Sequence, residues 1–133
     1  MERQGIMKAL TAPMQQLGEF EEILRKIRTN RGVLQVSGCI DPQKPHFISC
    51  AAEGYDCRLI ITYSDLRARE LYENYRFFDR DVLYFPAKDL IFFQADIHSN
   101  LLEQQRIAVL KALAERKNVT VITTMAACMN HLM

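Results

Sequence analysis

Short apolar runs alternate with helical patterns along most of this chain, and this alternation constrains the fold more than any other feature. Four apolar runs have the length and composition of strands: Val33–Val36, Arg58–Tyr63, Val82–Phe85 and Val119–Thr123. Strands that alternate with helices form a parallel sheet with helices on both faces, joined by right-handed crossovers. The sequence therefore predicts an α/β fold in which an N-terminal helical region precedes four strand–helix units. The isoleucine-rich run Arg58–Tyr63 is expected to be buried on both faces.

Local signals place the expected helices. At the N-terminus Ile6, Leu10, Met14 and Leu17 fall at helical spacing, and Pro13 suits the first turn of a second helix. That second helix carries an apolar stripe: Leu17, Phe20, Ile23, Leu24 and Ile27. Ser64 is expected to cap one later helix, and Asn100 with Glu103 to cap another. The later helices are expected at 46–52, 65–77, 101–116 and 125–133, and the apolar stretch 86–99 is expected to lay a short extended piece across the domain.

Composition and charge describe an ordinary globular chain. Its 133 residues suit one domain, with 49% hydrophobic residues, 25% charged residues and a net charge of +1. No apolar run approaches the about 20 residues that a membrane-spanning helix needs. The four cysteines, Cys39, Cys50, Cys57 and Cys128, form no C-x-x-C pair, which favours reduced thiols in a cytoplasmic protein. The sequence ends inside an apolar helical pattern, so we expect the chain to be an N-terminal fragment of a larger multidomain protein.

The loop after the first expected strand has the outline of a phosphate-binding P-loop, G-x-x-x-x-G-K-[ST]. Gly38 and Lys44 occupy the positions of the first glycine and the lysine, whereas Gln43 replaces the second glycine and Pro45 the hydroxyl residue. Pro42 and Pro45 each lack the backbone N–H that would bind a phosphate, and Pro45 also lacks the hydroxyl that would hold Mg²⁺. Each lost hydrogen bond to a charged phosphate costs roughly 1.5–3 kcal/mol. The loop is therefore either a degenerate nucleotide site or an ordinary strand–loop–helix connection with this spacing by chance.

Arg25, Lys26, Arg28 and Arg31 form the only dense basic cluster in the sequence. One interpretation is contact with phosphate or with an acidic partner. The alternative is a solvated helix end, because cations near a helix C-terminus are stabilised by the helix dipole.

Signals for catalysis are sparse. Asp96 and His98 lie close together near Asp89, and an Asp–His pair is typical of acid–base chemistry. The alternative is that these side chains bond the loop backbone. No G-x-S-x-G or H-E-x-x-H motif occurs, and no spacing of ligands predicts a metal site.

The stretch 84–113 resembles the N-terminal region of the bacterial transcription-repair coupling factor, Mfd. In that family a strand ending in an aromatic residue and proline is followed by a polar residue, an aromatic-rich segment and a helix with a Q-R-I/L motif. The matching residues here are Phe85-Pro86, Asp89, Phe92-Phe93, Asn100 and Gln105-Arg106-Ile107. At the level of element order the resemblance extends from about Gly32 to Met133, and it includes similarity to the first domain of UvrB.

The resemblance implies a degenerate RecA-like lobe that has lost nucleotide binding and has no catalytic activity. Its parent would be an ATP-dependent DNA translocase that displaces stalled RNA polymerase and recruits UvrA. ATP and Mg²⁺ would bind the parent's motor domains, and the main UvrA-binding domain would follow Met133. Two alternatives stay open: a lobe of an ATP-binding helicase with an unusual P-loop, and a small independent α/β domain that uses Asp96 and His98.

Overall fold

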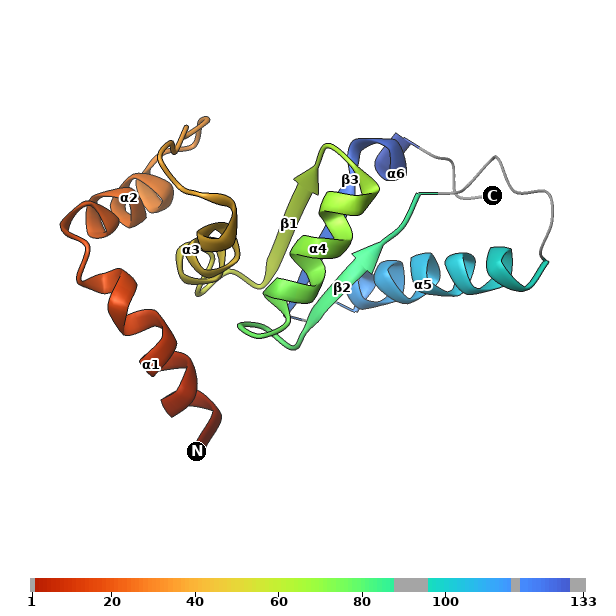
Figure 1. Cartoon of the computed structure of the whole chain (residues 1–133), viewed down its shortest axis with the longest axis horizontal. Coiled ribbons are helices and arrows are strands. Elements are labelled where there is room, and N and C mark those ends of the chain that lie inside the picture. Colours follow the sequence, from red (N-terminus) through yellow and green to blue (C-terminus); the bar gives the residue numbers. More distant parts are fainter. Residues whose placement is uncertain (1, 88–95, 116–117, 130–133) are drawn as a thin grey trace. The chain divides into compact units, whose positions relative to one another are not determined.

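A computed structural model of the chain describes residues 2–87, 96–115 and 118–129. By its internal contacts the chain divides into two compact units, Met1–Glu53 and Gly54–Met133. Figure 1 labels the helices and strands of both units. Among the described residues the first unit contains only helices and irregular segments, and the second contains a parallel sheet.

The first unit contains three α-helices and one 3₁₀-helix. These are α1 (Glu2–Gln15), α2 (Gly18–Thr29), η1 (Asp41–Gln43) and α3 (Lys44–Ala51). Pro13 lies inside α1, which ends at Gln15, and α2 begins at Gly18. The prediction that Pro13 opens the second helix is therefore wrong. Pro13 lacks the N–H that would bond the carbonyl of Ala9 and crowds that carbonyl, so it weakens the turn that precedes it, close to the end of α1.

A small apolar cluster holds the helices of the first unit together. Met14, Phe20 and Cys50 are buried, and Leu24 and Phe47 pack against them. The rings of Phe20 and Phe47 meet edge to face with centroids 5.9 Å apart. Phe20 and Leu24 belong to the predicted apolar stripe of α2, so the structure confirms that this stripe faces a core, although Leu17 at its start is 57% exposed.

The segment Val33–Val36 is not a strand, and that prediction is wrong. Residues 31–40 contain neither helix nor strand, and the side chain of Val33 is 96% exposed. A four-residue run has the composition of a strand, but a strand exists only where backbone partners complete a ladder. Among the described residues the sheet has three strands, whereas the sequence predicted four.

The second unit builds its sheet from three parallel strands in the order β1-β3-β2. Its elements are β1 (Cys57–Thr62), α4 (Asp65–Tyr75), β2 (Val82–Phe85), α5 (Asp96–Ala114), β3 (Val119–Thr124) and α6 (Met125–Met129). These bounds confirm the three later predicted strands to within one residue at each end. The strand–helix alternation of the sequence therefore specified this part of the fold.

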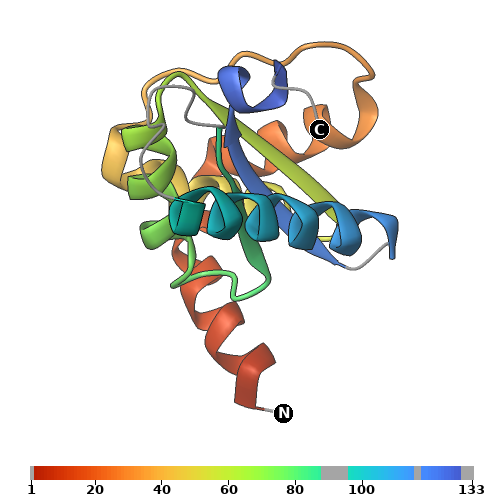
Figure 2. The same ribbon diagram turned by 90° about the vertical axis from the view of Figure 1, so that its right-hand side faces the viewer.

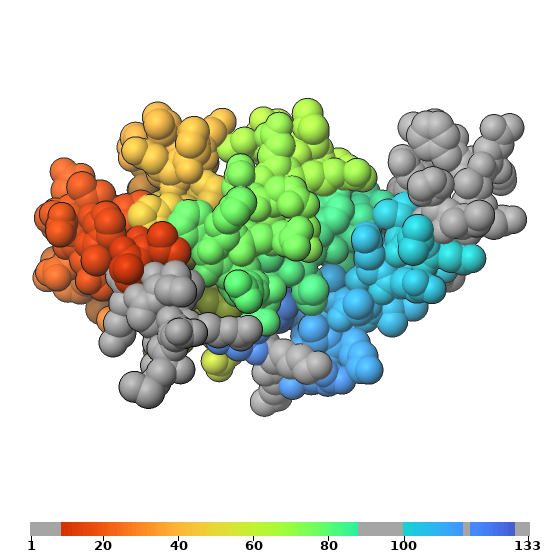
Figure 3. Space-filling view, turned by 60° about the horizontal axis from the view of Figure 1, so that its bottom comes forward, coloured from red at the N-terminus to blue at the C-terminus, as the bar shows by residue number. Residues whose placement is uncertain are grey.

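Strand register shows that α4 and α5 cover opposite faces of the sheet. Val121 pairs with Leu83, and both lie in one cluster with Val109 of α5. Tyr84, the next residue of β2, points to the other face and contacts Tyr72 of α4. Figure 2 shows α5 running across the strands, and Figure 3 shows side chains of both helices on the surface of this unit.

The strand β3 is the central strand, and β1 lies at an edge of the sheet. Every residue of β3 is buried, whereas Leu59 and Ile61 of β1 are 59% and 46% exposed. These two side chains point to the face that α5 covers, but α5 packs against β2 and β3. The prediction that Arg58–Tyr63 is buried on both faces is therefore wrong, because apolar content alone does not distinguish a central strand from an edge strand.

Helix boundaries agree with the predicted signals in part. Ser64 caps α4, and its Oγ accepts the backbone N–H of Arg67 at 3.2 Å, as predicted. Asn100 does not cap a helix, because α5 already begins at Asp96. The predicted extended piece lies mostly at 88–95, outside the described residues, as does the end of the last predicted helix at 130–133.

Candidate functional site

The loop with the P-loop outline forms hydrogen bonds within itself. Residues 41–43 form the 3₁₀-helix η1, and α3 begins directly at Lys44. The backbone N–H groups of Gln43 and Lys44 both donate to the carbonyl oxygen of Ile40, at 3.0 and 3.3 Å. A working P-loop directs successive N–H groups at phosphate oxygens. Here two of the corresponding donors are used inside the loop.

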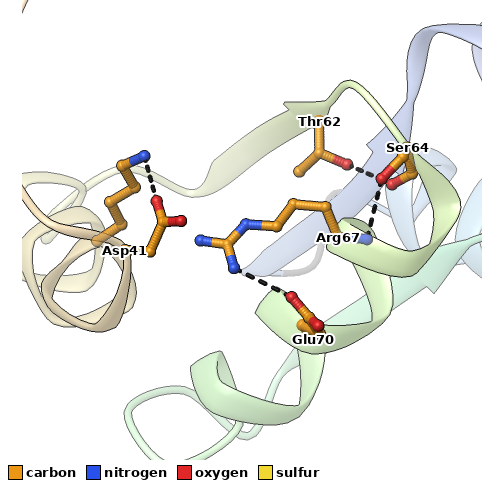
Figure 4. Close-up of polar contacts among 6 residues, drawn as sticks. Asp41, Thr62, Ser64, Arg67 and Glu70 are labelled. Atoms are coloured by element: carbon orange, nitrogen blue, oxygen red, sulfur yellow. Dashed lines mark hydrogen bonds and ion pairs between the residues drawn. The ribbon is translucent and has the colours of Figure 1, made fainter.

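The side chain of Lys44 is engaged by a neighbour in the same loop. Its Nζ lies 2.6 Å from Oδ1 of Asp41, a contact drawn at Asp41 in Figure 4. The side chains of the lysine and the aspartate are 48% and 59% exposed. An exposed pair of this kind adds little stability. It nevertheless places a carboxylate where a phosphate would have to approach the lysine.

Gly38 and Pro45 complete the four positions of the predicted remnant. Gly38 has φ of +86°, a left-handed conformation that favours glycine. Pro45 is buried in the first turn of α3, where its missing N–H costs no helical hydrogen bond. The chain thus keeps a tight turn at Gly38 and a helix start at Lys44. No strand precedes them, which removes one support of the P-loop interpretation.

At the carboxyl end of β1, polar side chains fix the turn into α4. Thr62 Oγ1 donates to the carbonyl oxygen of Ser64 at 3.0 Å, and Arg67 forms an ion pair with Glu70 at 3.1 Å (Figure 4). Asp65 accepts hydrogen bonds from the hydroxyl of Tyr84 and from Nε of Arg69. Ligands of open α/β sheets commonly bind at this end of the strands. Here both oxygens of the Asp65 carboxylate already accept hydrogen bonds from side chains of the same unit.

Arg106 is the largest fully buried side chain among the described residues, with 2% of its surface exposed. Its Nη1 donates to the carbonyl oxygens of Pro86 at 2.7 Å and Ala127 at 3.4 Å. Its guanidinium lies over the ring of Phe85, 4.1 Å from the centroid. Burial lowers the pKa of Arg106 from its ordinary value. Arg106 therefore links α5 to the ends of β2 and α6.

A second polar group lies at the amino end of the sheet. Thr120 is fully buried and donates its hydroxyl to Oδ2 of Asp79 at 2.7 Å, and Arg58 lies 3.5 Å from the same oxygen. Arg58 also bonds the side-chain oxygen of Asn118. Sequence reasoning missed both this group and the role of Arg106. Two signals in the sequence could have indicated them. Thr120 is a polar residue inside an apolar strand, and Arg106 precedes by three residues Val109, which faces the sheet.

The predicted basic cluster lies at the C-terminal end of α2 and just beyond it. Arg25, Lys26, Arg28 and Arg31 are all exposed. Lys26 pairs with Glu22 at 2.7 Å, and this hydrogen-bonded contact lowers the pKa of Glu22. The cluster and the altered loop both belong to the first unit.

The proposed acid–base pair is described only in part. Asp96 and His98 lie in the first turn of α5, but their side chains are outside the described ones, as is Asp89. Nε2 of His46 donates a hydrogen bond to the carbonyl oxygen of Leu10 at 2.5 Å and so connects α3 with α1. All four cysteines are free thiols in the structure.

Comparisons of the chain with protein-family models, with curated proteins and with solved structures found no match. None of the described helices is long and apolar enough to cross a membrane. Within the described part of the chain, no three His, Cys, Asp or Glu side chains gather as potential ligands of a metal ion.

Proposed function

We propose that this chain is a non-catalytic, RecA-like scaffold lobe, similar to the first domain of UvrB, from a bacterial transcription-repair coupling factor. One observation carries the non-catalytic part of the proposal. The backbone donors and the lysine of the P-loop outline are bonded within the loop itself, to Ile40 and Asp41. The family part rests on the resemblance of the stretch 84–113.

Nucleotide binding at this loop would require several contacts to be replaced at once. A phosphate would have to displace Asp41 from Lys44 and the Ile40 carbonyl from two N–H groups. Pro42 and Pro45 would supply no donor in return, and no hydroxyl stands at position 45 for Mg²⁺. The loop therefore loses more hydrogen bonds than it gains on binding phosphate. This supports a scaffold role over ATP hydrolysis.

The block that carries the resemblance also contributes a structural contact to the second unit. Its Arg106 donates to the carbonyl oxygen of Pro86, which directly follows β2, at 2.7 Å and to that of Ala127 in α6 at 3.4 Å. A lobe that serves as a scaffold needs such internal contacts to hold its shape. The proposed parent acts in transcription-coupled nucleotide excision repair in the cytoplasm. The lobe's partners would be the adjoining domains and, through the parent, UvrA, RNA polymerase and DNA.

Isothermal titration with Mg-ATP tests the non-catalytic part. We expect no binding tighter than about 1 mM, a limit that corresponds to about −4.1 kcal/mol. Micromolar binding that Lys44→Ala abolishes would refute the proposal and identify a lobe of an ATP-binding helicase with an unusual P-loop. Lys111→Ala is the matched control, because Lys111 is exposed on α5 in the other unit. The reading frame past Met133 tests the family part: helicase motor motifs after it are expected, and their absence counts against a coupling factor.

A further inference from the structure

The first unit contains a long stretch without acidic residues. Between Glu22 and Asp41 the sequence carries four cations, Arg25, Lys26, Arg28 and Arg31, and no aspartate or glutamate. The whole chain has a net charge of only +1, so this stretch concentrates positive charge locally. Such local clustering can attract polyanions even where the net charge of a protein does not.

Folding places these cations on an anchored, exposed surface. Another side of α2 is fixed in the apolar cluster by Phe20 and Leu24. Arg25 and Arg28 are three residues apart on α2, which brings their side chains to neighbouring positions on the helix surface. The helix ends at Asn30, whose side-chain oxygen accepts the backbone N–H of Gly32 at 3.0 Å. This bond closes the turn that carries Arg31.

Within the described part of the chain, the arginines of this surface form no ion pair with a carboxylate, unlike those of α4, although the charge of Arg25 contributes to the lowered pKa of Glu22. The α4 arginines and the arginine at its C-cap each pair with an acidic residue of that helix: Arg67–Glu70 at 3.1 Å, Arg69–Asp65 at 2.8 Å and Arg76–Glu73 at 3.3 Å. In the described part of the chain, no carboxylate lies within ion-pair distance of Arg25, Arg28 or Arg31. Lys26 alone in the cluster is paired, with Glu22.

The helix dipole explains only part of this arrangement. It favours cations in the last turn of a helix, which includes Lys26 and Arg28. It acts less on Arg25, which lies before the last turn of α2. A solvated helix end would also tolerate lysine at each position, whereas three of the four cations are arginines. The planar guanidinium group binds phosphate through two parallel hydrogen bonds.

We infer that Arg25, Arg28 and Arg31 form a binding surface for the phosphate backbone of nucleic acid. No phenylalanine, tyrosine or tryptophan occurs between Phe20 and Phe47, so this stretch offers no large aromatic ring on which a base would stack. Contacts to phosphate position a protein without reading sequence. The surface should therefore bind duplex DNA independently of sequence. This inference goes beyond the scaffold role and does not depend on whether the loop binds nucleotide.

Fluorescence anisotropy of the full chain with a labelled duplex tests the inference. If the three arginines each neutralise one phosphate, affinity should fall about 40-fold between about 50 and about 200 mM salt, from a slope near −0.9 per contact. Arg28→Gln should reduce this fall to about 12-fold, because one contact is lost. Arg80→Gln is the matched control: Arg80 is an exposed arginine outside the cluster, and it should leave the salt dependence unchanged.

Three results would overturn the inference. The first is equal DNA affinity for the wild type and for Arg25→Gln, Arg28→Gln and Arg31→Gln, each shown to be folded by its circular dichroism. The second is tighter binding to polyglutamate than to DNA, which would assign the surface to an acidic protein partner. The third is a large difference in affinity between two duplexes of unrelated sequence, because a surface that contacts only the backbone should bind both equally.

Discussion

Nη1 of Arg106 donates a hydrogen bond of 2.7 Å to the carbonyl oxygen of Pro86, and this bond joins the middle of α5 to the end of β2. The same nitrogen reaches the carbonyl oxygen of Ala127 in α6. The two carbonyls belong to residues that follow neighbouring parallel strands, β2 and β3. A single buried cation therefore connects the ends of two strands that are separated by more than thirty residues in the sequence.

Replacing Arg106 with alanine should destabilise the chain strongly. The substitution leaves two backbone carbonyls without this donor and removes the contact with the Phe85 ring. We expect the free energy of unfolding in urea to fall by about 2–4 kcal/mol, since an unsatisfied buried acceptor alone costs about 1–3 kcal/mol. Arg106→Lys should restore part of this loss, because lysine keeps the charge but not the planar group.

The control for Arg106 is Arg80→Ala. Arg80 is exposed, and substitutions at such sites usually change stability by less than about 0.5 kcal/mol. Equal effects of the two substitutions would show that Arg106 does not stabilise the sheet ends.

The sheet-forming part of the chain could be predicted because its local signals for strands, turns and caps agree with the tertiary contacts that form there. Val82–Phe85 is bounded by turn residues and followed by Pro86, and its predicted and observed limits are identical. Ser64 combines a good capping side chain with a following helical pattern, and its role was also predicted.

The two wrong strand predictions share one physical cause, which is that the choice of a strand partner is not encoded locally. Val33–Val36 has strand composition but no backbone partner in the structure, whereas Arg58–Tyr63 has a partner on one side only. The Asn100 signal failed because the preceding residues already continue the helix. The contacts of Arg106 and Thr120 arise between segments far apart in the chain, so spacing within any one segment does not reveal them.

Two isoleucines test the difference between the central and edge strands. Ile122 of β3 is completely buried, whereas Ile61 of β1 is 46% exposed. We expect Ile122→Ala to cost about 2–5 kcal/mol, because it removes buried methylene groups and leaves a cavity. Ile61→Ala should cost no more than about 1 kcal/mol, since much of the side chain already contacts water. Urea unfolding of both variants measures the difference. A loss at Ile61 as large as that at Ile122 would mean that β1 is covered in solution.

The buried hydroxyl of Thr120 should stabilise the amino end of the sheet. Thr120→Val keeps the shape of the side chain but removes the donor to Asp79. We expect a loss of about 1–3 kcal/mol, because a hydrogen bond to a charged group is removed while Asp79 stays in place. Thr29→Val is the comparison: its hydroxyl bonds the carbonyl of Arg25 at an exposed site, where water replaces the bond. Equal losses in thermal or urea unfolding would contradict the proposed role of Thr120.

Cys50 should make stability depend on pH in the alkaline range. Burial raises the pKa of its thiol above the ordinary value of 9.0, since a buried thiolate is poorly solvated. The unfolded chain then releases this proton at lower pH than the folded chain, so the contribution of Cys50 is complete below pH 9.0 and decreases as pH rises toward the folded pKa.

Urea unfolding at a series of pH values from neutral to alkaline measures this effect as the difference between wild type and Cys50→Ala. Alanine does not titrate, so the variant should lose less stability above pH 9.0 than the wild type does, although it starts from a lower value because a buried side chain is truncated. Cys57→Ala, at an exposed position, should follow the wild-type pH dependence. Parallel curves for the wild type and Cys50→Ala would show that the Cys50 thiol is solvated in the folded chain.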